Sequence, residues 1–150
     1  MNRRFVGYPA ALMLLALSYC AHAEVPAETE GQIDSRQAHF DYQLFCLGCH
    51  GPTGDGARGV PKIQGVIGTF LGSQSGREYL IKVPGAANAP LNDERLAQLM
   101  NWTIDQFAGD SEPEDWKSYN AAEIAEYRAE PLFEVEQYRK ELLSQLTEDK

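Results

Sequence analysis

Five consecutive residues, Cys46-Leu47-Gly48-Cys49-His50, constrain this chain more than any other stretch of its sequence. Two cysteines separated by two residues and followed at once by histidine form the pattern typical of covalent c-type haem attachment. The two thiols can form thioether bonds with the two vinyl groups of one haem, and Gly48 keeps bulk away from the porphyrin edge. His50 would then lie under the ring, where its imidazole can bind the iron as the proximal ligand. The motif occurs once, which indicates one haem c for each chain.

Two other chemistries fit some of the same residues. A zinc site needs four ligands, and Cys46, Cys49, His39 and His50 are nominally enough. The adjacent side chains of Cys49 and His50, however, rarely converge on one tetrahedral ion. A redox-active dithiol of the thioredoxin type would need a surrounding strand–helix–strand pattern, which the sequence lacks. Both alternatives stay open beside haem, which the context of the motif favours.

The residues that follow His50 resemble those of the class I mono-haem c-type cytochromes. The likeness runs through Gly51-Pro52-Thr53-Gly54-Asp55-Gly56 and then Pro61-Lys62-Ile63, which match the glycine-rich stretch of that family. The resemblance implies an all-α fold with a cytochrome c-like haem domain over residues 34–109. It also implies that the carbonyl of Pro61 accepts a hydrogen bond from the far nitrogen of the haem histidine, which would orient the ring.

Residues 1–23 are interpreted as a signal peptide that is removed on export. Arg3 and Arg4 are basic, and residues 10–17 form an apolar run that is too short to span a membrane. Ala21-His22-Ala23 is a small-residue cleavage site. Cleavage after Ala23 would release a periplasmic protein, which agrees with haem attachment outside the bacterial cytoplasmic membrane. A lipoprotein signal ending at Cys20 is the competing interpretation. Residues 24–33 are polar and are expected to form a disordered lead-in.

The helical spacing of apolar residues predicts most of the regular structure. In a helix that starts at Asp34 or Ser35, Phe40, Leu44 and Leu47 recur at this spacing, and we expect Phe40 to pack on a later helix. A short helix over 75–83 should end at Pro84. The clearest helix opens at Asn92 and continues to about residue 108. It resembles the C-terminal helix of c-type cytochromes, and we expect it to cross the first helix and frame the haem.

Residues 110–150 lie beyond the family resemblance and form an acidic helical extension, with 12 acidic and five basic residues. The capping box Asn120-Ala121-Ala122-Glu123 predicts a short helix to about residue 129. Pro131 suits the first position of a final amphipathic helix. The extension is interpreted either as a clamp that packs on the haem domain or as a docking surface for a partner, and the clamp is preferred.

The sixth iron ligand is the least constrained part of the site. In the resembled family a methionine from the loop before the last helix usually occupies this position, but the loop at 85–90 contains none. Met100 is the methionine that remains after removal of the leader, so it is a candidate distal ligand, although core packing also explains a methionine within a helix. The other possibilities are water, an empty position, or His39, Lys82 or Asn88. Arg77 is a candidate partner for a haem propionate, although a solvated surface arginine is the preferred interpretation.

The charge of the chain limits its partners. The net charge is −9, and loss of Arg3 and Arg4 with the leader makes it −11, so nucleic acid is an unsuitable partner. A redox protein with a basic docking patch is favoured. The resemblance implies a periplasmic electron-transfer protein, not an enzyme, whose iron cycles between Fe(II) and Fe(III), with a dehydrogenase or cytochrome on one side and a downstream acceptor on the other. The alternatives are a haem enzyme or small-ligand sensor with an open sixth position, and a dedicated electron-input subunit of one dehydrogenase.

Overall fold

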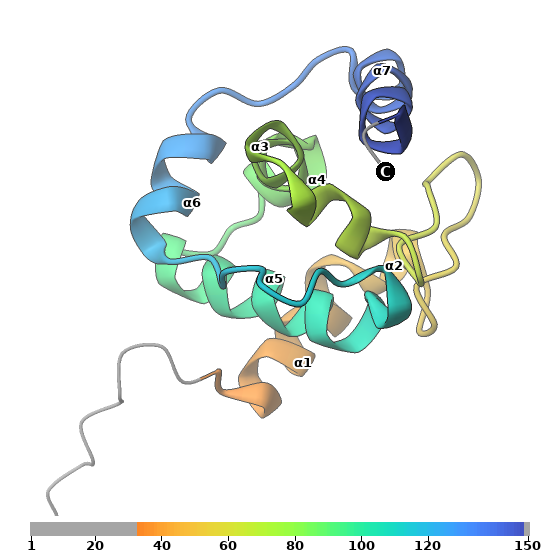
Figure 1. Ribbon diagram of the computed structural model, residues 1–150. Coiled ribbons are helices and arrows are strands. Elements are labelled where there is room, and N and C mark those ends of the chain that lie inside the picture. The colour runs from red at the N-terminus through yellow and green to blue at the C-terminus, as the bar shows by residue number, and fades with distance from the viewer. Residues whose placement is uncertain (1–32, 149–150) are drawn as a thin grey trace, which may run out of the picture.

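The computed structural model describes residues 33–148, in which all the regular structure is helical and there is no strand (Figure 1). The all-α fold class predicted from the sequence is therefore confirmed. The helices in chain order are α1 (Ser35–Phe45), α2 (Leu47–His50), η1 (Ile67–Gly72), α3 (Gln74–Lys82), α4 (Pro84–Ala87), α5 (Asp93–Phe107), η2 (Gly109–Ser111), α6 (Ala121–Arg128) and α7 (Val135–Glu148).

The segments assigned to the signal peptide and to most of the lead-in lie outside the described residues. Ile33, the last residue of that lead-in, packs against the hydrophobic core. Within residues 33–148, no helix combines the length and the apolar character that crossing a membrane requires.

Helices α1 and α5 pack against each other, as the sequence predicted. Asp41 of α1 is 1% exposed, and its carboxylate accepts hydrogen bonds from the guanidinium of Arg95 on α5 (Nε–Oδ2 3.2 Å). The ring of Tyr42 lies against that of Trp102, with 5.4 Å between their centroids. Asn92 caps α5 by accepting a hydrogen bond from the backbone N–H of Arg95 at 2.8 Å, as the sequence predicted.

The buried face of α1 differs from the prediction. Phe40 is 52% exposed and Leu44 is 57% exposed, so neither packs on a later helix. The residues that α1 buries are Ala38, Asp41 and Tyr42. Apolar spacing correctly indicated a helix, but it could not identify the inward face, because a charged residue is buried there by its ion pair with α5.

The glycine-rich stretch after His50 is a loop. Residues 51–66 form no helix, and η1 and α3 come next in the chain. Gly56 has a φ of +71°, and a Cβ added to it would lie 2.3 Å from the carbonyl oxygen of Val60. Only glycine allows the loop to fold back on itself at this point. Helix α3 ends at Lys82, just before Pro84, in agreement with the prediction.

Helix α6 begins with the predicted capping box: the Asn120 side chain accepts from the N–H of Glu123, whose carboxylate accepts from the N–H of Asn120. Helix α7, however, begins at Val135 and not near Pro131. The backbone N–H of Leu132 donates to the carbonyl of Lys82 at 2.8 Å. This hydrogen bond attaches the connection that leads to α7 to the end of α3, and the connection is extended in Figure 1.

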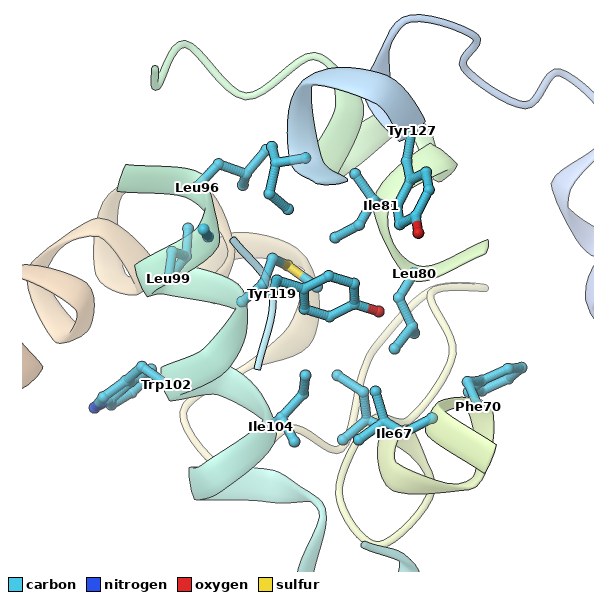
Figure 2. Packing of buried hydrophobic residues seen from close by; sticks show 14 of the residues in the cluster. Ile67, Phe70, Leu80, Ile81, Leu96, Leu99, Trp102, Ile104, Tyr119 and Tyr127 are labelled. Carbon is cyan, nitrogen blue, oxygen red and sulfur yellow. The ribbon is translucent and has the colours of Figure 1, made fainter. Parts of the chain in front are cut away.

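The extension shares one hydrophobic core with the preceding helices. Tyr119, Ile124 and Leu142 are at most 3% exposed and belong to the same buried cluster as residues of α3 and α5. Figure 2 shows Tyr119 and Tyr127 among the side chains of α3 and α5. Arg128 of α6 also donates hydrogen bonds to carbonyls in the segment before α5, those of Ala87, Ala89 and Leu91.

Candidate cofactor cavity

A cavity of about 310 Å³ lies between the motif and the hydrophobic core, and most of the side chains around it are apolar. Cys46, Cys49 and His50 all line it. Most of the rest of its lining comes from the 60–63 loop and from helices α1, η1, α3, α4, α5 and α7. The main apolar lining residues are Phe45, Val60, Ile63, Ile67, Phe70, Leu80, Val83, Leu96, Leu99, Met100 and Val135.

The short helix α2 and its N-cap, Cys46, hold the three motif residues within one turn. The backbone N–H groups of Cys49 and His50 donate to the carbonyl of Cys46 at 3.1 and 2.9 Å. Gly51 ends the turn with a φ of +74°, and its carbonyl accepts a hydrogen bond from the Tyr42 hydroxyl at 2.6 Å. Both thiols and the imidazole therefore reach one cavity because the local backbone is helical and fixed to α1.

No residue near Gly48 would prevent a larger side chain at this position. A Cβ added at this position would meet nothing within 4 Å. The interpretation that Gly48 leaves room for a porphyrin edge therefore stays a prediction.

The thiols are free, and their environment argues against a reactive dithiol. Cys46 is half-buried and Cys49 is exposed. Burial raises the pKa of Cys46 to about 11, and electrostatic interactions with Cys49 and Asp41 contribute to the rise. A redox-active cysteine needs a lowered pKa, because the thiolate is the nucleophile. The protonated Cys46 does not suit that chemistry.

The zinc alternative finds no support in the described part of the chain. Across residues 33–148, no group of three or more His, Cys, Asp or Glu side chains lies close enough together to hold a metal ion. His39, which the zinc hypothesis required, stacks on Trp102 with 5.4 Å between ring centroids. The two cysteines and the histidine that line the cavity therefore do not form a four-ligand zinc site within the described residues.

The imidazole of His50 is suited to bind a metal as a neutral ligand. Burial lowers its pKa, and a backbone interaction with Pro61 partly opposes this effect. Nδ1 is buried and has no hydrogen-bond partner of good geometry, so the interaction with the Pro61 carbonyl is a close approach and not a well-formed bond. The family resemblance implied this contact, and the structure brings the two groups together. A neutral imidazole keeps a lone pair for a metal.

Met100 also lines the cavity, from α5, and is 8% exposed. The three other side chains considered as sixth ligands do not line it. The ring of His39 stacks on Trp102, Lys82 pairs with Glu78 at 3.2 Å, and Asn88 donates to the Pro84 carbonyl at 2.9 Å. Met100 is therefore the candidate that the fold brings to the same cavity as His50.

Arg77 does not reach the cavity. Its guanidinium donates to the carbonyl of Lys117 at 2.6 Å and to the carboxylate of Glu123 at 2.9 Å, and it lies over the ring of Tyr119. These contacts tie α3 to the extension and occupy the guanidinium, so the structure gives no support to the prediction that Arg77 pairs with a haem propionate.

Sequence reasoning missed two residues of α7, Val135 and Arg139, that line the cavity. They are four residues apart and so lie on one face of the helix. Nothing in their local sequence points to a cofactor, because the extension lies outside the family resemblance. Their spacing of four residues predicts that they share one face of a helix, but it does not predict what that face contacts.

The comparisons with known proteins agree with the chemistry of the cavity. The chain is similar to two proteins named cytochrome c-552, one from Thermus thermophilus and one from an individual strain of that species. Each is 28% identical over 106 residues, which covers 58% of this chain and 81% and 72% of the respective relative. No protein-family model matches. No solved structure matches either. This weak homology supports a relation to the c-type cytochromes.

Proposed function

We propose that this chain is a periplasmic electron-transfer protein that carries one covalently bound haem c. The observation that carries the proposal is that Cys46, Cys49 and His50 share one largely apolar cavity with Met100. The similarity to two cytochromes c-552 supports the same class of function, and it relates the chain to cytochromes and not to an enzyme.

Each motif residue has a defined role. Cys46 and Cys49 would hold the haem through thioether bonds, and His50 would bind its iron as the proximal ligand. Pro61, beside the imidazole, would help to set the orientation of the ring. When bound, haem supplies an iron that changes between Fe(II) and Fe(III) by one electron. The apolar side chains of the cavity would exclude water from the iron and so favour electron transfer over exchange of ligands.

Met100 is proposed as the distal ligand. A thioether ligand raises the reduction potential of haem iron, as a carrier requires, and it closes the position that a sensor or enzyme would keep open. Its place in the cavity wall supports the carrier over both alternatives. The partner would be a redox protein with a basic docking patch, because the chain has a net charge of −9.

Expression in a host with a cytochrome c maturation system tests the proposal. We expect a red protein that keeps its haem through acid–acetone extraction, with one haem per chain by pyridine haemochrome. Cys46→Ala and Cys49→Ala should each leave at most one thioether bond and little stable holoprotein. His39→Gln is a matched control for His50→Gln, because His39 does not line the cavity.

Colourless wild-type protein with stoichiometric zinc from such a host would refute the haem assignment. Peptide sequencing of the mature protein tests export, and an N-terminus at Glu24 is expected. Equal loss of haem in the His39 and His50 variants would show that the cavity histidine has no special role.

A further inference from the structure

The charged residues that line the cavity have the opposite sign to the chain as a whole. The chain has 22 acidic residues and 13 lysines and arginines, yet the charged lining residues are Lys62 and Arg139, and no aspartate or glutamate of the described chain lines the cavity. An apolar cavity with cations at its wall suits an occupant that has a large apolar body and anionic groups.

The two cations differ in what they already bind. Lys62 forms an ion pair with Asp55 at 3.6 Å, and its side chain is 53% exposed. Arg139 is half-buried, and its guanidinium lies 5.7 Å from the centre of the Phe70 ring. Among residues 33–148, Arg139 forms no ion pair, even with Glu136 three residues earlier on the same helix.

Three other arginines that are partly or largely buried are all paired. Arg77 binds Glu123, Arg95 binds Asp41 and Arg128 binds Asp93. This is the ordinary arrangement, because removing a guanidinium from water is costly unless a carboxylate compensates for it. Arg139 is thus a partly buried cation, at the wall of a cavity, that lacks the carboxylate its counterparts have within the described residues.

We propose that Arg139 binds a propionate carboxylate of the haem, so that α7 of the extension forms part of the cofactor site; this inference rests on the haem function proposed above. A guanidinium can hold a carboxylate through two parallel N–H···O bonds. Val135, one turn earlier, would cover the neighbouring apolar part of the occupant. Neutralising a propionate removes negative charge near the iron and favours Fe(II) over Fe(III), so Arg139 raises the reduction potential.

The test uses the full mature holoprotein with the variants Arg139→Gln and Arg139→Lys. Lys140→Gln is the matched control, because it removes one positive charge from the adjacent residue of α7. Lys140 is exposed. Haem content, midpoint potential and the pH dependence of that potential are measured for each protein. Haem content separates this inference from the proposed function, because the thioether bonds do not depend on Arg139.

We expect Arg139→Gln to keep its haem but to lower the midpoint potential. The expected shift in the ratio of reduced to oxidised protein is about threefold to tenfold, where tenfold corresponds to about 59 mV for one electron. The potential should also become more dependent on pH where a free propionate titrates. Arg139→Lys should recover most of the potential, and Lys140→Gln should change neither quantity.

Equal shifts of the midpoint potential in Arg139→Gln and Lys140→Gln would overturn the inference. They would show that any positive charge on α7 affects the iron at long range, without a bond to a propionate. If Arg139→Gln lowers the melting temperature but leaves the midpoint potential unchanged, the inference is also overturned. Arg139 would then only pack on Phe70. Wild-type protein without haem would refute the proposed function, and this inference with it.

Discussion

The substitution Leu142→Ala tests whether the extension is a clamp on the haem domain. Leu142 lies on α7, is 3% exposed and belongs to the core cluster that contains residues of η1, α3 and α5. Truncation removes about three buried carbons, worth about 0.8 kcal/mol each. With the cavity that remains, the free energy of unfolding should fall by about 2–4 kcal/mol. For a chain of this size the melting temperature should fall by roughly 10 °C.

The assay is thermal and urea unfolding of the haem-loaded protein. Phe133→Ala is the control, because Phe133 is 93% exposed in the connection to α7 and its truncation removes a larger side chain. The control should stay within about 0.5 kcal/mol of wild type. If Leu142→Ala unfolds at the same temperature and urea concentration as wild type, α7 does not pack on the core in solution. The extension would then be a docking element, and deleting it would weaken a salt-sensitive partner interaction instead.

Three further predictions follow from other contacts. Met100→Leu should abolish the far-red sulfur-to-iron band of the ferric spectrum and lower the potential, whereas an unchanged high-spin spectrum would make Met100 a packing residue. Arg95→Met should cost about 3–5 kcal/mol in urea unfolding because it leaves buried Asp41 unpaired, and Asp41→Asn in the same chain should recover part of this loss. Burial raises the pKa of Tyr42 to about 12 and also raises that of Tyr119. The unfolded chain ionises these phenols near pH 10, so their contribution to the free energy of unfolding should be fully present below about pH 10 and be lost above it. Stability should therefore fall above about pH 10, less steeply in Tyr119→Phe, and a flat profile between about pH 10 and pH 12 would contradict this.

The sequence by itself determined the features that depend on neighbouring residues. The spacing of Cys46, Cys49 and His50 requires only one helical turn, so it indicated the cofactor chemistry without knowledge of the fold. The caps at Asn92 and Asn120 are likewise local hydrogen bonds, and the helices that they start were predicted close to their observed bounds.

Only the tertiary structure decided which side chains meet across the fold. Phe40 faces outward and Asp41 inward because Arg95, far along the chain on α5, pairs with Asp41. Met100 borders the same cavity as His50 because α5 packs beside the helix that leads into the motif, and Arg139 reaches it because α7 returns over η1 and α3. Periodicity shows that a helix has two faces, but the energy that selects the buried one comes from partners distant in the chain, and these become neighbours only when the chain folds.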